Sequence, residues 1–354
     1  MSNDSKTRLA FLGIDNPHGS AWRDLFRENF ADRLEITALM PGFDGATTSL
    51  EESLNHLPRF DSVDDLIANG GDLIDAAFIG LPNNETPTAA VKLARAGKHI
   101  LVEKPMAGSA EPAKPVAEAV SESGVNFQSG FIWRYDEIAD RLRDMVADGR
   151  FGKRLINVEI SFTTSDVKKR DPDHYLFDRE ISGGGFFNWL ACHQLDLLFY
   201  ITGQKIAGVT ARTGVFGQHD CEVEDGGAVI MDLSGGGIAT FVGGYWLPRW
   251  AGESHWSFRG GDRWVHWDPG RAGTGGALDI HGPQPQWNAM EEVFELPPDS
   301  TPGYGGNRAV KAVADWLDGG ENRNTPQSTV DTLALLDAIA ESSETGHRVT
   351  CEIG

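Results

Sequence analysis

Short apolar runs alternate with amphipathic segments through the amino-terminal part of the chain, and this alternation limits the folds open to it. A strand followed by a helix and a further strand is typical of parallel βαβ units. A helix near residues 115–123 and a strand at 125–130 would complete the pattern. We therefore predict a doubly wound parallel α/β domain over residues 1–128. Its earlier apolar runs fall at residues 9–12, 34–40, 74–79 and 100–102.

The pattern changes after residue 134. Strands now follow one another, and the last two flank the turn Ser234-Gly235-Gly236-Gly237. Strands joined by a tight glycine turn are typical of an antiparallel sheet. We therefore predict a second, α+β domain over residues 129–354 with a large, mostly antiparallel open sheet. Its strands are expected at 154–163, 208–216, 228–233 and 238–246, and its helices at 138–147, 307–317 and 329–343.

Composition argues against several classes of protein. The net charge of −21 argues against nucleic acid or an anionic membrane as a partner. No apolar run reaches the ~18 residues of a membrane span, and the first residues lack the apolar core of a secretory signal. The three cysteines are scattered along the chain, and the stretch at 219–225 has residues that can bind metal but no recognised spacing. Neither feature predicts a metal site. We expect a cytoplasmic protein, with a solvated loop at 219–225; whether its host is halophilic stays open.

One lysine is placed where open α/β sheets bind their ligands. Glu103-Lys104-Pro105 follows the apolar run at 100–102, so Lys104 should lie just past the carboxyl end of a strand. Pro105 disfavours helical geometry at Lys104 and makes a cis bond possible. An amine held there can face a substrate hydroxyl, although a surface lysine at a strand–turn boundary would give the same pattern.

The turn after the first strand matches a dinucleotide fingerprint only in part. Gly13 fits the first glycine of Gly-x-Gly-x-x-Gly, but Asp15 and His18 occupy the other two glycine positions. Asn16 as N-cap, with Pro17 at the first helical position, predicts a helix start whose free amides can bind an anion. His18 could donate a further hydrogen bond to that anion.

The end of the second strand bears on the choice of dinucleotide. No acid stands directly at the position of the usual ribose-binding residue, although Asp44 follows nearby. No cluster of arginines stands there to hold a 2′-phosphate. The sequence therefore leaves both NAD and NADP open.

A largely apolar helix is expected after the glycine triplet at residues 183–185. Asn188, His193 and Asp196 are polar exceptions on it, and buried polar groups need partners. With α-helical spacing, Trp189, His193 and Asp196 would share one face. His193 can take up a proton near neutral pH, which suits an acid or base, whereas a hydrogen-bonded core histidine is the alternative.

Taken together, these segments resemble the Gfo/Idh/MocA family of NAD(P)-dependent oxidoreductases. The resemblance covers nearly the whole chain. It implies a Rossmann domain, followed by a substrate-binding domain whose open sheet often mediates homo-oligomers, here a dimer or tetramer. It rests on Leu81-Pro82-Asn83-Asn84, on residues 97–105, on Trp133-Arg134, and on the glycine triplet with His193 and Asp196.

The resemblance also implies roles for individual residues. Lys104 would polarise the reacting oxygen, and His193 would exchange its proton while hydride passes to or from the nicotinamide. Lys104 and His193 would thus flank one substrate. The expected cofactor-binding residues are Gly13, Asp15, Asn16, His18, Pro82, Asn83, Glu103, Lys104 and Arg134. The expected substrate-binding residues are Lys104, Tyr175, Asn188, Trp189 and His193.

Three positions depart from the family pattern. Trp189 stands four residues before the histidine, where the family commonly has Asp. Thr86 and Tyr175 replace a common His and Trp. We expect an NAD(P)-dependent dehydrogenase that interconverts alcohol and ketone on a sugar, cyclitol or related polyol. The alternatives are a lyase or glycosidase that retains its cofactor and uses transient oxidation, and a non-catalytic dinucleotide-binding regulator.

Overall fold

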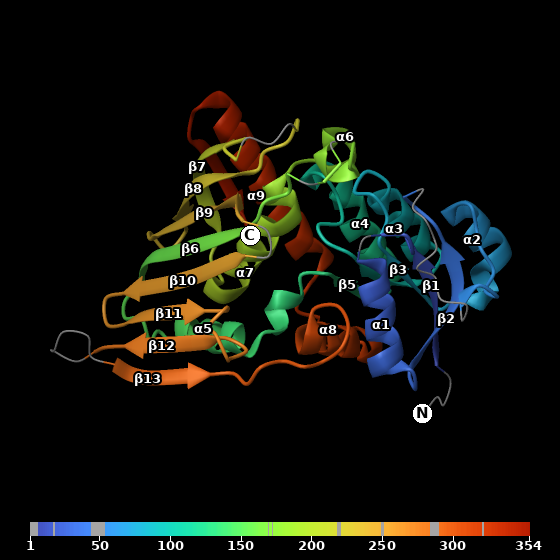
Figure 1. Ribbon diagram of the computed structural model, residues 1–354, viewed down its shortest axis with the longest axis horizontal. Helices are drawn as coiled ribbons and strands as arrows, with labels where there is room; N and C mark the ends of the chain where they lie inside the picture. The colour runs from blue at the N-terminus through green and yellow to red at the C-terminus, as the bar shows by residue number, and fades with distance from the viewer. Residues whose placement is uncertain are drawn as a thin grey trace. The chain divides into compact units, whose positions relative to one another are not determined.

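A computed structural model gives the course of the chain (Figure 1). It describes all residues except 1–5, 17, 44–53, 169, 172, 218–220, 249–250, 284–289 and 321. Asp44 and Pro17, which the sequence had singled out, therefore lie outside the described residues. Among the residues that are described, no helix combines the length and the apolar character that a membrane span requires.

A five-stranded sheet in the order β2-β1-β3-β4-β5 occupies the amino-terminal part of the chain. All its neighbouring strands are parallel, which confirms the predicted doubly wound α/β sheet. The order reverses between β1 and β3, and ligands of such sheets bind beyond the carboxyl ends of the strands at this reversal. The strands are β1 (Thr7–Leu12), β2 (Leu34–Met40), β3 (Ala76–Ile79), β4 (His99–Val102) and β5 (Phe127–Ser129).

Helices bury this sheet, and the buried residues of β1, β3 and β4 are accordingly all apolar. Rings of Trp22 and Phe26 on α1 pack on Phe78 of β3, with centroids 4.9 and 5.7 Å apart. α8 packs in the same core through Val313 and Trp316. The helices of this unit are α1 (Gly19–Phe30), α2 (Val63–Gly70), α3 (Thr86–Arg95), α4 (Ala110–Ser123) and α8 (Gly306–Asp318).

A second sheet of nine strands has the order β13-β12-β11-β10-β6-β9-β8-β7-β14. Its pairs are antiparallel except β6 with β9, which confirms the predicted large, mostly antiparallel sheet. The sequence had indicated β6, β7, β8 and β9 but not the strands at either edge. The strands are β6 (Leu155–Ser165), β7 (Ile206–Gly214), β8 (Gly226–Leu233), β9 (Ile238–Leu247), β10 (Gly252–Gly260), β11 (Trp264–Asp268), β12 (Ala277–His281), β13 (Met290–Glu295) and β14 (Val349–Ile353).

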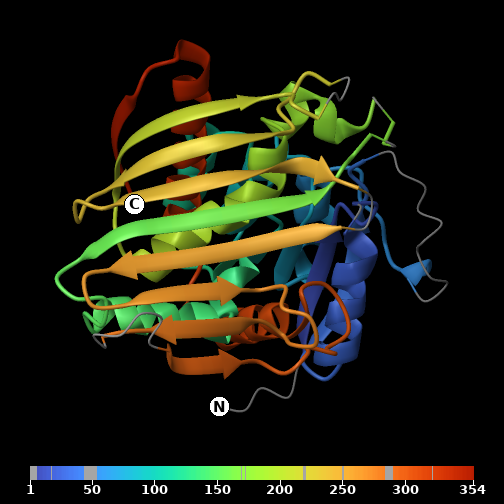
Figure 2. The same cartoon turned by 60° about the vertical axis from the view of Figure 1, so that its left-hand side comes forward.

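One face of the nine-stranded sheet packs on helices, and Figure 2 looks onto the other face. Trp256 and Phe258 point to the helical side and are fully buried. On the opposite side, Ile230, Ile238 and Val242 are 50%, 43% and 47% exposed. This uncovered side is called the open face below. The helices of this unit are α5 (Glu137–Ala147), α6 (Arg179–Ser182), α7 (Cys192–Thr202) and most of α9 (Pro326–Thr345).

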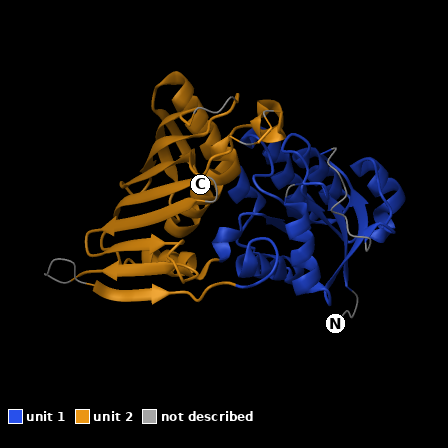
Figure 3. Ribbon diagram, viewed as in Figure 1, with its two compact units in different colours: residues 1–135, 300–330 blue, residues 136–299, 331–354 orange. Residues whose placement is uncertain are grey.

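The chain divides into two compact units at other points than the expected boundary between residues 128 and 129 (Figure 3). Unit 1 is residues 1–135 with 300–330, and unit 2 is residues 136–299 with 331–354. The later segment returns to unit 1 because α8 packs on the parallel sheet. It is also held by Arg134 and Arg323, each of which donates an Nη1 hydrogen bond to the other's carbonyl oxygen, at 2.8 and 2.9 Å. Periodicity along a helix identifies its buried face but not the sheet on which that face packs.

Candidate functional site

Glycines bring the ends of three strands in unit 1 close together. Gly13, after β1, has φ +72°, a left-handed conformation that favours glycine. A Cβ there would overlap the carbonyl oxygen of Gly80, which follows β3. A Cβ on Gly42, after β2, would lie 3.4 Å from the Cα of Gly13 and 3.7 Å from Cδ of Pro82. The carboxyl ends of the strands therefore present closely spaced backbone, as a dinucleotide-binding edge requires.

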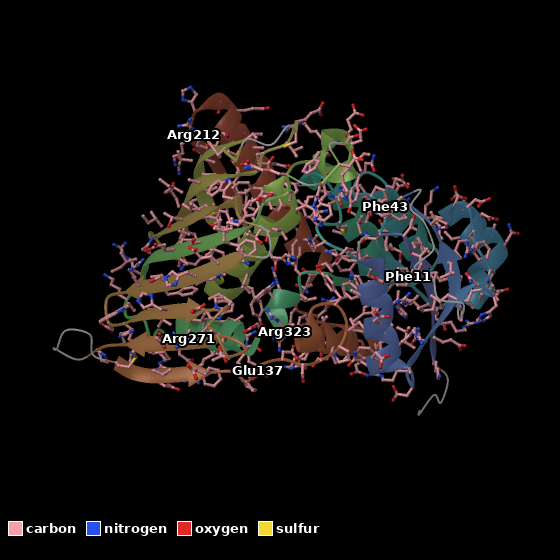
Figure 4. All side chains as sticks on the ribbon, in the orientation of Figure 1. Phe11, Phe43, Glu137, Arg212, Arg271 and Arg323 are labelled. Atoms are coloured by element: carbon pink, nitrogen blue, oxygen red, sulfur yellow. The ribbon has the colours of Figure 1, made fainter. Side chains whose placement is uncertain are left out.

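Asp15 fills the second glycine position of the fingerprint and ties this turn to the end of β2. Its Oδ1 accepts a hydrogen bond from the backbone N–H of Gly42, and its Oδ2 accepts one from Phe43, both at 2.8 Å. Phe43 is labelled in Figure 4. The carboxylate is thus held at the carboxyl end of β2 by two backbone amides.

Asn16 is not the N-cap of α1, contrary to the prediction. The N-cap is His18, and it makes no side-chain capping bond. Asn16 instead donates from Nδ2 to the carbonyl of Gly80 at 2.8 Å, and its Oδ1 accepts from the N–H of His18 at 2.8 Å. The side chain therefore shapes the turn before the helix, and the helix begins at Gly19. The N–H of Gly19, the first residue of α1, donates to the backbone carbonyl of Asn16 at 2.7 Å.

His18 and Glu103, both predicted to contact the cofactor, are brought together from 85 positions apart. Nδ1 of His18 donates to Oε1 of Glu103 at 2.8 Å, and Oε2 accepts from the N–H of Lys104 at 3.1 Å. Burial acts to raise the pKa of Glu103, but the hydrogen bond from His18 and the charges of His18 and Lys104 hold that pKa below its ordinary value. A Cβ on Gly130, after β5, would lie 2.6 Å from Oε2 of Glu103. Gly130 is therefore needed for this packing, which the sequence had not indicated.

Lys104 lies two residues past the end of β4, just beyond the strand as predicted, and only 6% of it is exposed. The Lys104–Pro105 peptide bond is cis. Met106 follows with φ 77°, a left-handed conformation that is costly for a residue with a side chain and is often found near functional sites. The lysine is thus a buried group at the ligand-binding edge of the sheet, and the surface-lysine alternative does not hold.

The segment after β3 carries Pro82 and Asn83 at the same edge. Thr86, which stands where the family often has a histidine, is buried and donates from Oγ1 to the carbonyls of Leu81 and Pro82, at 3.0 Å each. Its side chain therefore fastens the start of α3 to this turn. The cofactor contacts of Pro82, Asn83 and Arg134 stay predictions, although the guanidinium of Arg134 has the structural partner described above.

These features of unit 1 fit a dinucleotide. The first turn of α1 holds no acidic residue, and the dipole of a helix N-terminus favours an anion such as a pyrophosphate. A Cβ on Gly13 would overlap the carbonyl oxygen of Gly80, and one on Gly19 would lie 2.5 Å from that of Ile14, so both glycines are needed for the close backbone packing of this turn. Among the predicted cofactor residues, Gly13, Asp15, Asn16, His18, Pro82 and Glu103 all belong to this one edge.

In unit 2, each glycine of the triplet has its own structural reason. Gly183 ends α6 with φ +81°, which favours glycine. A Cβ on Gly184 would lie 2.5 Å from Oδ1 of Asn188. A Cβ on Gly185 would overlap the backbone carbonyl of Glu224. The triplet therefore allows the residues before α7 to pack against the segment that contains Glu224.

Glu224 anchors the chain at the start of the helix that carries His193. Its Oε1 accepts hydrogen bonds from the N–H groups of Gly185 at 2.9 Å and Phe187 at 3.1 Å. Its backbone carbonyl accepts from the N–H of Phe186 at 3.0 Å. Burial raises the pKa of this carboxyl. The prediction of a solvated loop at 219–225 is wrong for Glu224, and its partners are too distant in sequence for any local motif to reveal them.

His193 lies on α7, which is preceded by a π-helical segment, Phe187–Ala191. The N–H of Cys192 donates to the carbonyl of Phe187, five residues back. Because a π-turn is wider than an α-turn, the predicted common face of Trp189 and His193 does not follow from α-helical spacing. Single π-turns inside helices are frequent at functional sites. His193 is 8% exposed.

Two other polar residues of α7 have partners that account for their burial. Oε1 of Gln194 accepts a hydrogen bond from Nε1 of Trp256 at 2.9 Å. Oδ1 of Asp196 accepts one from Oγ1 of Thr332 on α9, at 3.2 Å, and Asp196 is fully buried. These two residues therefore fit a structural role in the core.

The predicted substrate residues of unit 2 fall on two sides of the π-turn. The rings of Tyr175 and Trp189 are neighbours, with centroids 5.5 Å apart. The cavity beside Trp189 measures only about 10 Å³, room for about one water molecule. Asn188 instead lines a cavity of about 300 Å³ together with Gly184 and Thr213. Asn188 and Trp189 therefore face different cavities, and their contacts with substrate stay predictions.

Comparisons with known proteins identify the family. Residues 9–131 match the model of an oxidoreductase family with an NAD-binding Rossmann fold, and residues 139–278 match the GFO/IDH/MocA C-terminal domain. D-xylose 1-dehydrogenase (NADP(+)) 2 of Haloferax volcanii is 23% identical over 322 residues, 90% of this chain and 93% of the relative. Inositol 2-dehydrogenase of Rhizobium meliloti is 32% identical over 142 residues, 40% of this chain and 41% of the relative.

Solved structures share the whole fold. Levoglucosan dehydrogenase in complex with NADH and levoglucosan has a TM-score of 0.82 at 16% identity, with 99% of both chains covered. GenD2 from gentamicin A biosynthesis, in complex with NAD, has a TM-score of 0.77 at 22% identity, with 100% of this chain and 98% of the other covered. At these identities the likeness supports the fold alone. Since the two family models cover most of both sheets, the chain belongs to the Gfo/Idh/MocA family of oxidoreductases.

Proposed function

We propose that this protein is an NAD(P)-dependent dehydrogenase that interconverts an alcohol and a ketone on a sugar, cyclitol or related polyol. The observation that carries the proposal is the buried Lys104 at the carboxyl edge of a dinucleotide-binding sheet, beside the His18–Glu103 pair. The names of the relatives support the substrate class, because they include xylose, inositol and levoglucosan dehydrogenases.

The residues of the chain divide the work. The turn at Gly13 and the start of α1 bind the pyrophosphate, since backbone amides and the helix dipole favour an anion there. When bound, the nicotinamide accepts or donates a hydride. Lys104 binds the reacting oxygen and stabilises its negative charge, and His193 takes or gives the hydroxyl proton. Burial of both side chains excludes bulk water from the two polar groups.

Tyr175, Asn188 and Trp189 contribute to sugar recognition in this proposal. The neighbouring rings of Tyr175 and Trp189 offer apolar faces, and Asn188 offers an amide to hydroxyl groups. Since Asn188 and Trp189 line different cavities, only the variant whose side chain lies in the sugar site, W189A or N188A, is expected to raise KM more than it lowers kcat. Equal KM values for both variants and the wild type would remove these residues from the substrate site.

The test uses Lys104→Ala, His193→Ala and the double variant, with Lys153→Ala as an exposed control. A panel of sugars and cyclitols with NAD and NADP first identifies the substrate. Loss of a general acid–base group lowers kcat/KM by about 10²–10⁴. If both groups serve one molecule, the double variant loses less than the product of the single losses. Wild-type kcat/KM in both single variants would refute the assignment, and thermal unfolding reports on whether each variant folds.

Two rival activities make different predictions for the same panel. A lyase or glycosidase that oxidises its substrate transiently would form product without net release of NADH. A regulator would bind NADH saturably and exchange no hydride with any sugar. Appearance of NADH in step with ketone product supports the dehydrogenase.

We further propose that the chain forms a homo-oligomer, a dimer or tetramer, through the open face of the nine-stranded sheet. Ile230, Ile238 and Val242 are large apolar side chains on adjacent strands of this face, and each is about half exposed. Apolar clusters of this kind mark protein interfaces. Light scattering of the wild type and of the Ile230→Asp and Val242→Asp variants tests this: a monomeric wild type, or variants with unchanged mass, would refute it.

A further inference from the structure

We propose that Asp15 makes this chain selective for NAD over NADP, by holding a negative charge where the 2′ position of the adenosine ribose is read. The inference rests on the proposed function only in that a dinucleotide binds to unit 1. The sequence had left this choice open, because no acid follows β2 directly. The structure supplies the acid from a different strand end.

The location of the carboxylate is fixed by two hydrogen bonds. Its Oδ1 and Oδ2 accept from the N–H groups of Gly42 and Phe43, both at 2.8 Å. Those residues follow β2, which ends at Met40. In doubly wound dinucleotide-binding domains, the end of the second strand carries the acid that hydrogen-bonds the ribose 2′-hydroxyl. Asp15 comes from the β1–α1 turn but brings its carboxylate to the end of β2.

The same two bonds work against a 2′-phosphate. Free amides at the end of a strand or in a turn are good donors for a phosphate group. Here the amides of Gly42 and Phe43 already bond to an anion, so a phosphate would find these donors engaged and a like charge beside them. A ribose hydroxyl, by contrast, is a donor, and a carboxylate has about four acceptor sites in all.

The sequence around β2 supplies no compensating cation. Residues 34–58 contain neither Lys nor Arg. Arg59 is the next basic residue, and its backbone forms a bridge with Leu39 in β2. Its guanidinium is exposed and lies 3.5 Å from Oδ1 of Asn55. Arg59 is therefore the first basic residue along the chain after β2, and it enters the test for that reason.

Membership of the family does not decide the cofactor. The Haloferax volcanii relative is named for NADP(+), whereas scyllo-inositol 2-dehydrogenase of Bacillus subtilis is named for NAD(+). The contacts of Asp15 are thus specific evidence from this chain.

The experiment measures dissociation constants of NADH and NADPH by fluorescence titration, without any substrate. Asp15→Asn keeps the shape of the side chain and removes its charge. Asp32→Asn is a matched control at an exposed position on the loop after α1. Arg59→Ala tests the remaining cation. The wild type is expected to bind NADH at least about tenfold more tightly than NADPH, since a like charge at close range is worth about that factor. Asp15→Asn should reduce this ratio about tenfold, chiefly by tighter NADPH binding, whereas Asp32→Asn and Arg59→Ala should leave it unchanged.

Three results would overturn the inference. They are a wild type that binds NADPH as tightly as NADH, an Asp15→Asn variant with the wild-type ratio, and an Arg59→Ala variant that loses NADPH affinity selectively. If Asp15→Asn does not fold, the wild-type ratio alone decides. Binding of both dinucleotides with equal affinity would refute only the role of Asp15, whereas binding of neither would refute the proposed function as well.

Discussion

Removal of the Glu224 carboxyl should disturb the helix that carries His193 without touching the dinucleotide-binding unit. Glu224 accepts the N–H groups of Gly185 and Phe187 on a single oxygen, Oε1. Gly185 lies just before the π-helical segment and Phe187 is its first residue, so neither amide has an earlier turn of this helix to bond to. In Glu224→Ala both would lose their acceptor, and the start of the helix would be free to shift.

The expected size of the effect follows from these two bonds. Loss of a side-chain cap costs about 0.5–2 kcal/mol, and a buried N–H group left without its acceptor costs about 1–3 kcal/mol. Since the carboxyl of Glu224 is only partly exposed, we expect Glu224→Ala to lower the free energy of unfolding by about 2 kcal/mol. For a unit of this size that corresponds to a fall in Tm of about 4–8 °C.

Catalysis should suffer more than stability. A misplacement of about 1 Å in a reacting group can cost about 100-fold in rate, so kcat of Glu224→Ala should fall by between about 10- and 100-fold. Glu224→Gln should recover most of both losses, because one amide oxygen can accept both N–H groups. Glu222→Ala, on the same segment but exposed, is the control.

The assays are thermal unfolding, steady-state kinetics, and NMR titration of the His193 imidazole. The NMR signal reports on the surroundings of His193 whether or not the enzyme turns over. An unchanged His193 resonance and pKa in Glu224→Ala, with kcat equal to that of the wild type, would refute the reasoning. A loss that Glu224→Gln fails to restore would show that charge, and not the shared acceptor oxygen, is what matters.

Other groups give further predictions. The pKa of Glu103 is held below its ordinary value of 4.5, so its ion pair stabilises the fold above pH 4.5. This stabilisation is lost as the pH falls through the lower pKa of the folded state. Acid unfolding of Glu103→Gln should therefore show a weaker pH dependence than that of the wild type. Burial, and then two neighbouring histidines, lowers the pKa of His266 on the open face. The free energy of unfolding should therefore fall as the pH drops below 6.5, and His266→Gln should make this dependence on pH weaker. Gly185→Ala would drive a Cβ into a backbone carbonyl and should cost more than about 2 kcal/mol in denaturant unfolding, whereas Gly261→Ala, with open space around it, should cost less than about 1 kcal/mol.

Local sequence patterns were sufficient for the parallel sheet and for the position of Lys104. Five short apolar runs with helical spacing between them have few other solutions, and an apolar run followed by Glu-Lys-Pro marks a strand end without knowledge of any distant residue. The same holds for the hairpin at Ser234–Gly237, where the N–H of Gly236 donates to the carbonyl of Leu233. In each case the information lies within a few residues.

Local patterns failed where a residue's role depends on a distant partner. Strands β10 to β13 mix aromatic, charged and small residues, and only pairing with β6 and with one another makes them strands. Asn16 has the residue type of an N-cap, but the carbonyl of Gly80 competes for its side chain. α8 is amphipathic in sequence, but only its packing in the tertiary structure shows that it covers the parallel sheet.

The sequence by itself determined the parallel sheet, the family, and the placement of a lysine and a histidine after recognisable elements, because apolar periodicity and short motifs are local properties. The tertiary structure alone decided that Asp15 reaches the end of β2, that His18 bonds to Glu103, and that Glu224 holds the helix of His193. Those pairings join residues 27, 85 and 39 positions apart. A hydrogen bond between such residues is set by how the strands and helices pack, and no spacing along the chain encodes it.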